Sequence, residues 1–485
     1  MVSTKLSKVA SGSSNTDQEA DTIPAGGAHD APKPEEITID TEQRSQDSQE
    51  QGLVTEAVDP VFGNEDGAAI HYRTMEWYHA STLMLAETIS LGVLALPQCI
   101  AILGLVPGIL LITIIGLIAS YTGLIIGQFK EAFPLVHSFA DAGELICGKV
   151  GKEIMAVSQV LILVFIQAAH VLSFSIAMNA LTDHGACSVV FSFIGVMLCF
   201  ILGLPRKFQD VSYLSIVSCV SVVIAVTVAM IAIAIQKPDY GHALAIQPDV
   251  SVVKGLGPVL NIVLAYAGHV AFFPICAELK KPHDFPKAIA CTQIIACSFY
   301  VLIGAIIYTY AGPHVASPAL GSASPLVRKI SFGLAIPTII IAGVVNGSVA
   351  CKYVYIRVWK GTNVIHRSDF KSLGSWVGIC AALWGASWVI AMAIPQFNLL
   401  LGFIAALFCS WFSYTLPAIL WLYMNQGKHF SSKRKGLVTT VNIFIIFFGL
   451  AICSLGLWSS GVALAQGAAG KVFSCENNWK LESES

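Results

Sequence analysis

The chain has 485 residues, of which 55% are hydrophobic and only 12% are charged, and its net charge is -2. A soluble domain has roughly a quarter of its residues charged, so this composition predicts a protein whose solvent is the lipid bilayer. The small net charge excludes the broad basic surface that binds nucleic acid, and we expect no such partner. The sequence contains no zincin motif, GxSxG elbow or phosphate loop, so we expect neither an enzyme nor a cofactor or metal.

Residues 1–72 are expected to form a disordered cytosolic tail. The stretch is rich in Ser, Thr, Asp, Glu, Gln and Pro and lacks a hydrophobic run, so it has too little apolar surface to fold. Lys5, Lys8, Lys33 and many Ser offer acceptors for modification, which would make the ubiquitin and endocytic machinery partners; a plain solvated tail is the alternative. Because no signal peptide precedes it, the first membrane helix is expected to direct insertion.

Residues 73–465 alternate apolar runs with short loops and are predicted to form one transmembrane domain. A spanning helix needs about 20 apolar residues, which predicts an all-α polytopic fold of about eleven helices rather than a β-barrel of shorter strands. Residues 395–398 are read as a turn between two spans, although one kinked helix is the alternative. The expected spans are 76–103, 105–128, 153–181, 187–204, 211–236, 255–279, 287–312, 330–357, 374–395, 397–424 and 437–465.

The positions of Lys and Arg predict the orientation. The loops after the second, fourth, sixth, eighth and tenth spans hold most of these residues, and the positive-inside rule places such loops in the cytosol. The N-terminus is then cytosolic, and the C-terminal tail, 466–485, is extracellular. Cys187 and Cys475 both fall in segments expected outside, so a disulfide between them is an option that the sequence leaves open.

Two of the expected helices have Gly and Pro at corresponding places. The first contains AETISLGVLALP at 86–97, and the sixth contains AYAGHVAFFP at 265–274. Gly lowers helix stability by about 1 kcal/mol and an interior Pro by about 3, so unwinding there costs less than elsewhere. Because five helices separate the two places, the pattern predicts two inverted halves around a midplane site. Ordinary Gly and Pro of membrane helices are the alternative.

Unwound backbone at these two places is the predicted substrate site. Free N–H and C=O groups, together with the partial charges of half-helix ends, can bind the carboxylate and ammonium of an amino acid. Walls rich in Ala, Ile and Phe favour neutral or aromatic substrates, because an unpaired charge in a dry site is costly. The predicted substrate-binding residues are Thr88, Ile89, Ser90, Leu91, Gly92, Gln167, Ala265, Tyr266, Gly268, His269, Phe272 and Asn346.

Three ionisable residues deep in the apolar spans are candidates for proton coupling. Glu87 lies about ten residues into the first span, near mid-bilayer, where a charged side chain costs about 3 kcal/mol and must face a cavity, pair or take up a proton. We predict that Glu87 carries the proton; a structural partner of His79 or of a polar residue on a facing helix is the alternative. His170 and His269 either relay protons or only hydrogen-bond between helices.

Several runs make the chain similar to a known family. ETISLGVLALPQ, LPRKFQDVSYLSIVS, LAYAGHVAFFPICAELKKPHDFPKAI and IPQFNLLLGFIAALFCSWFSYTLPAILW resemble those of the amino acid/auxin permease family, in particular its fungal N-system neutral and aromatic amino acid permeases. The resemblance covers about residues 73–465. It implies a LeuT-like five-plus-five inverted repeat followed by an eleventh helix, and ion-coupled uptake of neutral amino acids at the plasma membrane.

The first-helix motif departs from that of the sodium-coupled relatives. They carry an Asn shortly before the first motif glycine, and the matching position here is Ala86, followed by Glu87, which favours protons over sodium. Gly92 matches the second motif glycine, and Ser90 replaces the first. The expected function is therefore import of neutral aliphatic and aromatic L-amino acids by proton symport with alternating access. The alternatives are a non-transporting amino acid sensor and a vacuolar exporter.

Overall fold

The computed structural model describes residues 75–205, 211–359, 362, 369–466 and 471–479. In these residues the secondary structure is helical, apart from an isolated parallel β-bridge between Met75 and Leu279. The predicted tail, 1–72, lies outside the described residues, as do its lysines.

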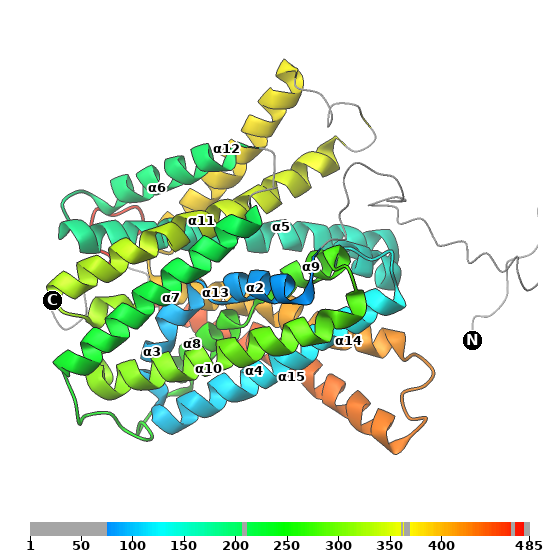
Figure 1. Ribbon diagram of the computed structural model, residues 1–485, viewed down its shortest axis with the longest axis horizontal. Helices are drawn as coiled ribbons and strands as arrows, with labels where there is room; N and C mark the ends of the chain where they lie inside the picture. The colour runs from blue at the N-terminus through cyan, green and yellow to red at the C-terminus, as the bar shows by residue number, and fades with distance from the viewer. Residues whose placement is uncertain (1–74, 206–210, 360–361, 363–368, 467–470, 480–485) are drawn as a thin grey trace, which may run out of the picture. The chain divides into compact units, whose positions relative to one another are not determined.

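The helices run back and forth between two ends of a bundle (Figure 1). We call the end that holds Lys130, Lys280, Lys281, Lys428 and Lys433 the lysine-rich end, and the other the opposite end. In chain order the helices are α2 (Trp77–Thr88), α3 (Gly92–Leu103), α4 (Leu105–Ala132), α5 (Phe139–Thr182), α6 (Ser188–Gly203), α7 (Val211–Gln236), α8 (Val252–Ala265), η1 (Gly268–Ala271), α9 (Phe272–Glu278), η2 (Pro282–Asp284), α10 (Phe285–Ala311), η3 (Gly312–His314), η4 (Ala319–Ser322), α11 (Pro325–Val358), α12 (Phe370–Ala393), α13 (Phe397–Ile404), η6 (Ala405–Thr415), α14 (Leu416–Met424) and α15 (Lys433–Ala465).

All of the expected spans are helical, which confirms the all-α polytopic fold. Among the described residues, nine helical segments are long and apolar enough to cross a membrane, and α2 with α3 makes a tenth span bent by 57°. The remaining expected span is α6, whose 16 residues extend about 24 Å at 1.5 Å per residue. The predicted turn near 395 is also present, between the end of α12 and the start of α13.

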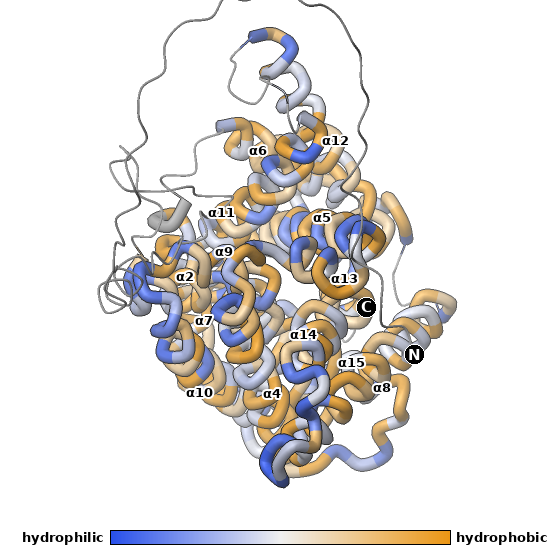
Figure 2. The backbone as a smooth tube through the Cα atoms, turned by 90° about the vertical axis from the view of Figure 1, so that its right-hand side faces the viewer, coloured by the Kyte–Doolittle hydropathy of each residue, from blue (hydrophilic) through white to orange (hydrophobic). Residues whose placement is uncertain are grey.

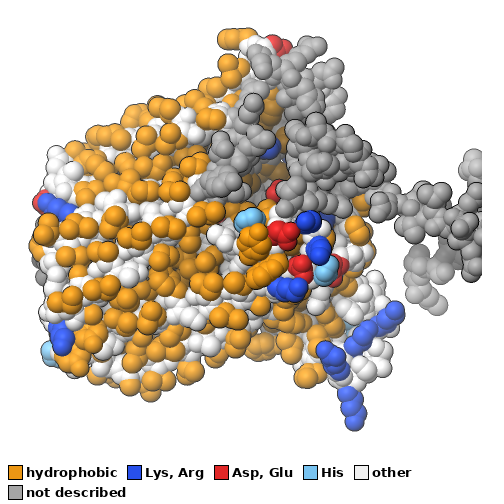
Figure 3. All heavy atoms as spheres, viewed as in Figure 1, with side chains coloured by type: hydrophobic (Ala, Val, Ile, Leu, Met, Phe, Trp, Pro, Cys, Tyr) orange, Lys and Arg blue, Asp and Glu red, His pale blue; other side chains and the backbone are white. Residues whose placement is uncertain are grey.

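The surface of the bundle is apolar between its two ends. Hydrophobic residues dominate the helices, while hydrophilic residues gather in the connections (Figure 2). On the face shown in Figure 3, charged side chains lie toward the two ends and hydrophobic side chains cover the band between them. Leu117 on α4 and Phe447 on α15 each keep 66% of their surface exposed. Such a continuous apolar surface is stable in contact with lipid rather than water.

Two elements differ from the expected spans. α5 begins at Phe139 rather than near residue 153, because Ser138 caps its N-terminus and a kink at Gly148 joins a polar first segment to the apolar one. The tenth expected span contains a π-helix, η6, between α13 and α14. The apolar length of a segment predicts that it crosses the membrane. It predicts neither the polar first segment of α5 nor the wider π-helical turns of η6.

Each predicted half of the chain begins with an interrupted helix. α2 and α3 are separated at residues 89–91, and α8 gives way to the short 3-10 helix η1 at residues 266–267. The half-helices α3 and α8 pack on each other, as do α5 and α11, which are the third helices of the two halves. This arrangement places the two breaks side by side within the bundle.

A C-terminal segment, residues 471–479, packs against the opposite end. Cys475 forms a disulfide with Cys187, so the pairing that the sequence left open is present. Asn478 accepts a hydrogen bond of 2.8 Å from Asn179 at the end of α5. Trp479 stacks under the guanidinium of Arg328, at 4.0 Å from the ring centre. The segment therefore joins the ends of α5, α6 and α11.

Candidate functional site

A cavity of about 350 Å³ lies at the two helix breaks. From the breaks it extends toward the lysine-rich end, because Gln159 on α5, Glu278 on α9 and Val349 on α11 line that side of it. Its remaining lining residues are Leu83, Ala86, Glu87, Thr88, Ser90, Leu91, Gly92, Leu163, Ile166, Ala169, His170, Ser215, Leu264, Ala267, Gly268, Val270, Ala271, Pro274, Ile275, Ala342, Val345, Asn346, Leu401 and Ile404. We call this space the substrate cavity, after the substrate-binding residues that the sequence predicts for it.

The structure brings together eight of the predicted site residues and leaves six outside the lining. The eight that line the substrate cavity are Glu87, Thr88, Ser90, Leu91, Gly92, His170, Gly268 and Asn346. The six that do not line it are Ile89, Gln167, Ala265, Tyr266, His269 and Phe272.

Two glycines let the breaks approach each other. A Cβ atom on Gly92 would lie 2.7 Å from the Cα of Ala265, a backbone atom that cannot turn aside. A Cβ atom on Gly268 would lie 3.1 Å from Oγ1 of Thr88. The first residues of α3 also have N–H groups without a partner in a preceding turn, so the start of α3 provides hydrogen-bond donors at the cavity wall.

Glu87 meets a polar residue on a facing helix. The Glu87 carboxyl is partly buried and hydrogen-bonds the side chain of Asn346 on α11. Nδ2 of Asn346 also donates to the carbonyl of Ala342 over 2.9 Å, which fixes the direction of the amide. His79 is exposed at the surface. Glu87 therefore has both a partner on a facing helix and access to the substrate cavity.

The two candidate histidines lie in different surroundings. His170 lines the substrate cavity, and its Nδ1 lies 2.9 Å from the carbonyl oxygen of Ile339 on α11. His269 is fully buried, and its Nε2 lies 3.0 Å from the carbonyl of Ala119 and 3.0 Å from Oγ1 of Thr122, both on α4. A carbonyl only accepts, so each ring donates a hydrogen bond between helices.

The other residues outside the lining pack behind the cavity wall. Oε1 of Gln167 accepts a hydrogen bond of 2.9 Å from Ser387 on α12. The Phe272 ring lies 3.1 Å from where Gly123 on α4 would carry a Cβ atom. These contacts hold the helices that carry the site.

Tyr300 on α10 is a site residue that the sequence prediction missed. Its hydroxyl oxygen lies 2.7 Å from the carbonyl oxygen of Thr88 and 2.8 Å from that of Ala265. These carbonyls end α2 and α8, where helix dipoles place partial negative charge, and the hydroxyl has one proton to share between them. A tyrosine in an apolar run predicts a buried ring whose hydroxyl is hydrogen-bonded. The sequence does not show which group accepts that hydrogen bond.

Ser90 and three polar residues that the sequence prediction did not name also line the cavity wall. Oε1 of Gln159, Oγ of Ser90 and Oγ of Ser215 are buried and lack a hydrogen-bond partner, and Glu278 adds a second carboxyl. Gln159 was missed, although helical spacing could have found it: residues 159, 163, 166 and 170 share one face of α5. Ser215 and Glu278 carry no comparable signal, because each lies near the end of its helix.

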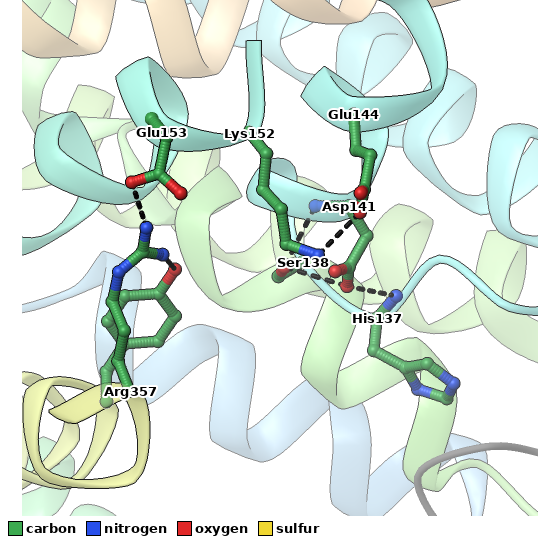
Figure 4. A network of polar contacts seen from close by, with 8 residues as sticks. His137, Ser138, Asp141, Glu144, Lys152, Glu153 and Arg357 are labelled. Atoms are coloured by element: carbon green, nitrogen blue, oxygen red, sulfur yellow. Dashed lines mark hydrogen bonds and ion pairs between the residues drawn. The ribbon is translucent and has the colours of Figure 1, made fainter. Parts of the chain in front are cut away.

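Polar contacts join the scaffold helices at the lysine-rich end (Figure 4). Oγ of Ser138 donates to Asp141 over 2.9 Å and caps the start of α5. Arg357, at the end of α11, pairs with Glu153 on α5. α5 and α11 are therefore held together beside the part of the cavity that lies toward this end.

Comparisons with known proteins agree with this architecture. Residues 73–461 match the family described as transmembrane amino acid transporter protein. The chain is 34% identical over 405 residues to the N amino acid transport system protein of Neurospora crassa, covering 82% of this chain and 86% of that relative. It is 30% identical over 429 residues to a transmembrane transporter of Gibberella moniliformis, covering 86% and 90%.

A solved structure supports the fold. The crystal structure of MhsT in complex with L-phenylalanine superposes with a TM-score of 0.53 at 13% identity, covering 79% of this chain and 98% of that one. At this identity the likeness concerns the arrangement of the helices, which is the LeuT-like one expected from the sequence.

Proposed function

Because the chain belongs to the family of transmembrane amino acid transporter proteins, we propose that it imports neutral aliphatic and aromatic amino acids by proton symport with alternating access. The observation that carries the proposal is the position of Glu87. Its carboxyl lies at the break of the first helix, hydrogen-bonds Asn346 and lines the substrate cavity. One group thus lies both at the wall of the cavity and at the junction of a broken helix.

The substrate class follows from the wall of the cavity. The start of α3, at Leu91 and Gly92, offers backbone N–H donors and a positive dipole end to a carboxylate. Leu83, Ile166 and Leu401 line the cavity with aliphatic surface, against which a charged side chain would lose its hydration without compensation. A neutral side chain loses nothing comparable, so the wall favours aliphatic and aromatic amino acids.

The proton is assigned to Glu87 because a carboxyl in an apolar cavity is stable when it is neutral or partnered. When protonated, it donates one hydrogen bond and carries no charge through the bundle. Glu278, which lines the cavity on its lysine-rich side, is the second carboxyl on the route between Glu87 and that end. Ala86 stands where sodium-coupled relatives have an amide, so this position offers no side-chain oxygen to a sodium ion.

The orientation is part of the proposal. Most loop lysines lie at one end, which the positive-inside rule assigns to the cytosol. The disulfide between Cys187 and Cys475 lies at the opposite end, and disulfides persist in oxidising compartments such as the cell exterior. Both signals support a cytosolic lysine-rich end at the plasma membrane, with the substrate cavity extending toward the cytosol.

Uptake of labelled amino acids in permease-deficient cells tests this function. The wild-type chain should take up neutral and aromatic substrates, independently of sodium. If the protonated fraction of Glu87 limits uptake, uptake should be faster at acid pH and should fall by up to about tenfold for each unit by which the pH rises. Glu87→Gln, which mimics the protonated carboxyl, should remove this pH dependence.

Asp183→Asn is the matched control, because Asp183 is an exposed carboxyl at the opposite end. Lys329, 2.6 Å away, holds the pKa of the Asp183 carboxyl below its ordinary value of 3.8. A depressed pKa contributes stability above the unfolded-state value and loses it as pH falls through the folded value. Asp183 therefore stays ionised at the pH values of the assay, and the control should keep the wild-type pH profile.

Other outcomes separate the alternatives. Sodium-dependent uptake would contradict the coupling, and an unchanged pH profile in Glu87→Gln would remove Glu87 from the mechanism. A surface-expressed chain that binds but never moves amino acids would be a sensor. A tagged chain found on the vacuole would favour the exporter.

A further inference from the structure

A second cavity, of about 560 Å³, lies toward the opposite end of the bundle. It is lined by residues of α3, α8, α13 and α15 and of the segments just before α8 and α13, and we call it the outer cavity. Leu260 on α8 and Gly402 on α13 line it, whereas Leu264 and Leu401, on the same helices, line the substrate cavity. The two cavities are therefore neighbours separated by the wall that α8 and α13 form.

The outer cavity is polar for a space inside a membrane bundle. Half of its lining residues carry amide, hydroxyl or ammonium groups, and no Asp or Glu is among its lining in the described part of the chain. Lys254 is its charged residue and is exposed at its mouth. The polar lining residues are Gln98, Ser251, Lys254, Asn261, Gln396, Asn398, Ser459, Ser460 and Gln466.

Asn261 is the residue that points to a ligand. It is only 3% exposed, and its side chain hydrogen-bonds the thiol of Cys99. Its Oδ1 has no hydrogen-bond partner and lies beside Gly402, 3.8 Å from where that glycine would carry a Cβ atom. A buried carbonyl without a donor is unfavourable, so this wall is complete only when a solute or water donates to Oδ1.

A neighbouring amide is held in a fixed direction. Oγ of Ser317 donates to Oδ1 of Asn398 over 2.7 Å, and Nδ2 of Asn398 donates to Oε1 of Gln98. Because Oε1 of Gln98 accepts this hydrogen bond, the Nε2 donors of Gln98 face away from Asn398. The outer cavity is therefore lined by a free acceptor at Asn261 and by the amide of Gln98, whose oxygen is already hydrogen-bonded.

We propose that the outer cavity is a second binding site, which takes a free amino acid. The ammonium group donates to Oδ1 of Asn261, and the carboxylate lies toward Lys254, whose flexible stem reaches along α8 from two turns away. The lack of lining carboxylates favours a carboxylate ligand over a cation. The choice of an amino acid rests on the proposed function, whereas the site itself rests on the cavity and Asn261.

Binding stoichiometry of the full chain tests the proposal. Wild-type protein in lipid nanodiscs should bind two molecules of labelled phenylalanine per chain in a scintillation proximity assay. Lys254→Glu should weaken the outer site by at least about tenfold, and Asn261→Leu should leave one molecule per chain. Lys254 is exposed, so its substitution does not endanger folding. Lys237→Glu, at an exposed lysine that does not line the outer cavity, is the matched control and should still bind two.

The outcomes distinguish this site from the proposed transport. One molecule or none per wild-type chain, or two in both Lys254→Glu and Asn261→Leu, overturns the outer site. One molecule per chain with normal uptake in cells overturns the outer site alone. Two molecules per chain, reduced by Lys254→Glu but not by Lys237→Glu, with no uptake in cells, support the outer site and overturn transport alone.

Discussion

At the scale of single residues, Tyr300 joins the two interrupted helices through one hydroxyl group. Tyr300→Phe would remove the one hydroxyl proton that the carbonyls ending α2 and α8 share, at a cost of about 1–3 kcal/mol for a buried group left without its donor. The packing at Gly92 and Gly268 would remain, but the hydrogen bonds that join the two breaks through Tyr300 would be lost. We expect a maximal uptake rate reduced several-fold at wild-type surface expression, measured as kcat and KM for a neutral substrate.

Tyr308→Phe is the control for this prediction. Tyr308 is also fully buried on α10, but its hydroxyl accepts from the backbone N–H of Leu244 in a loop, over 2.9 Å. The Tyr308→Phe variant also loses a buried hydroxyl, but one that makes no contact with a helix break. Its uptake rate should therefore stay near that of the wild type. Equal losses in the two variants would show that Tyr300 acts only through general stability.

Some of the residues that the sequence placed at the site line the substrate cavity and others do not, and the reason is geometric. Glu87 and Asn346 could be predicted because polar groups deep in apolar spans must face a cavity or a partner. His269 meets the same criterion but faces α4. It lies in the 3-10 helix η1, where three residues per turn replace 3.6, so the regular spacing of α8 does not give its direction. Sequence identifies such residues more readily than it orients them at a break.

At the scale of elements, the contact between α3 and α8 depends on Gly92. Gly92→Ala would place a Cβ atom 2.7 Å from the Cα of Ala265, and a backbone neighbour can relieve the clash only if a half-helix shifts. Overpacking of this kind costs about 1–3 kcal/mol. We expect a lower melting temperature in detergent, together with a loss of uptake larger than that of surface expression.

Gly385→Ala on α12 is the matched control for Gly92→Ala. A Cβ atom there would meet nothing within 4 Å, and alanine is the better helix former by about 1 kcal/mol. Its melting temperature should be unchanged or higher. If Gly92→Ala behaved in the same way, close approach of the two breaks would not matter to the fold.

The extents of the elements show where sequence reasoning ends. Apolar length and the Gly and Pro positions were enough to predict the spans and both breaks, because the bilayer demands long apolar helices with satisfied backbones. The early start of α5 depends on the cap at Ser138, and the π-helix η6 has no apolar signature. Both are local hydrogen-bonding choices, which hydropathy does not record.

At the scale of the whole molecule, the chain contains its own probes of orientation. Cys187 and Cys475 are paired at the opposite end, and Cys147 is a free, exposed cysteine on the first segment of α5, at the lysine-rich end. If the lysine-rich end is cytosolic, a membrane-impermeant maleimide should not label the chain in intact cells. After mild reduction it should label Cys187 and Cys475, and it should reach Cys147 only after permeabilisation.

Two variants make this labelling pattern decisive. Replacing both Cys187 and Cys475 with Ser should abolish the labelling that depends on reduction, while Cys147→Ser should abolish the labelling that depends on permeabilisation. Labelling of Cys147 in intact cells would place the lysine-rich end outside. Alternating access would survive such a reversal, but the substrate cavity would then extend toward the exterior, so import would have to begin from the state described here rather than end in it.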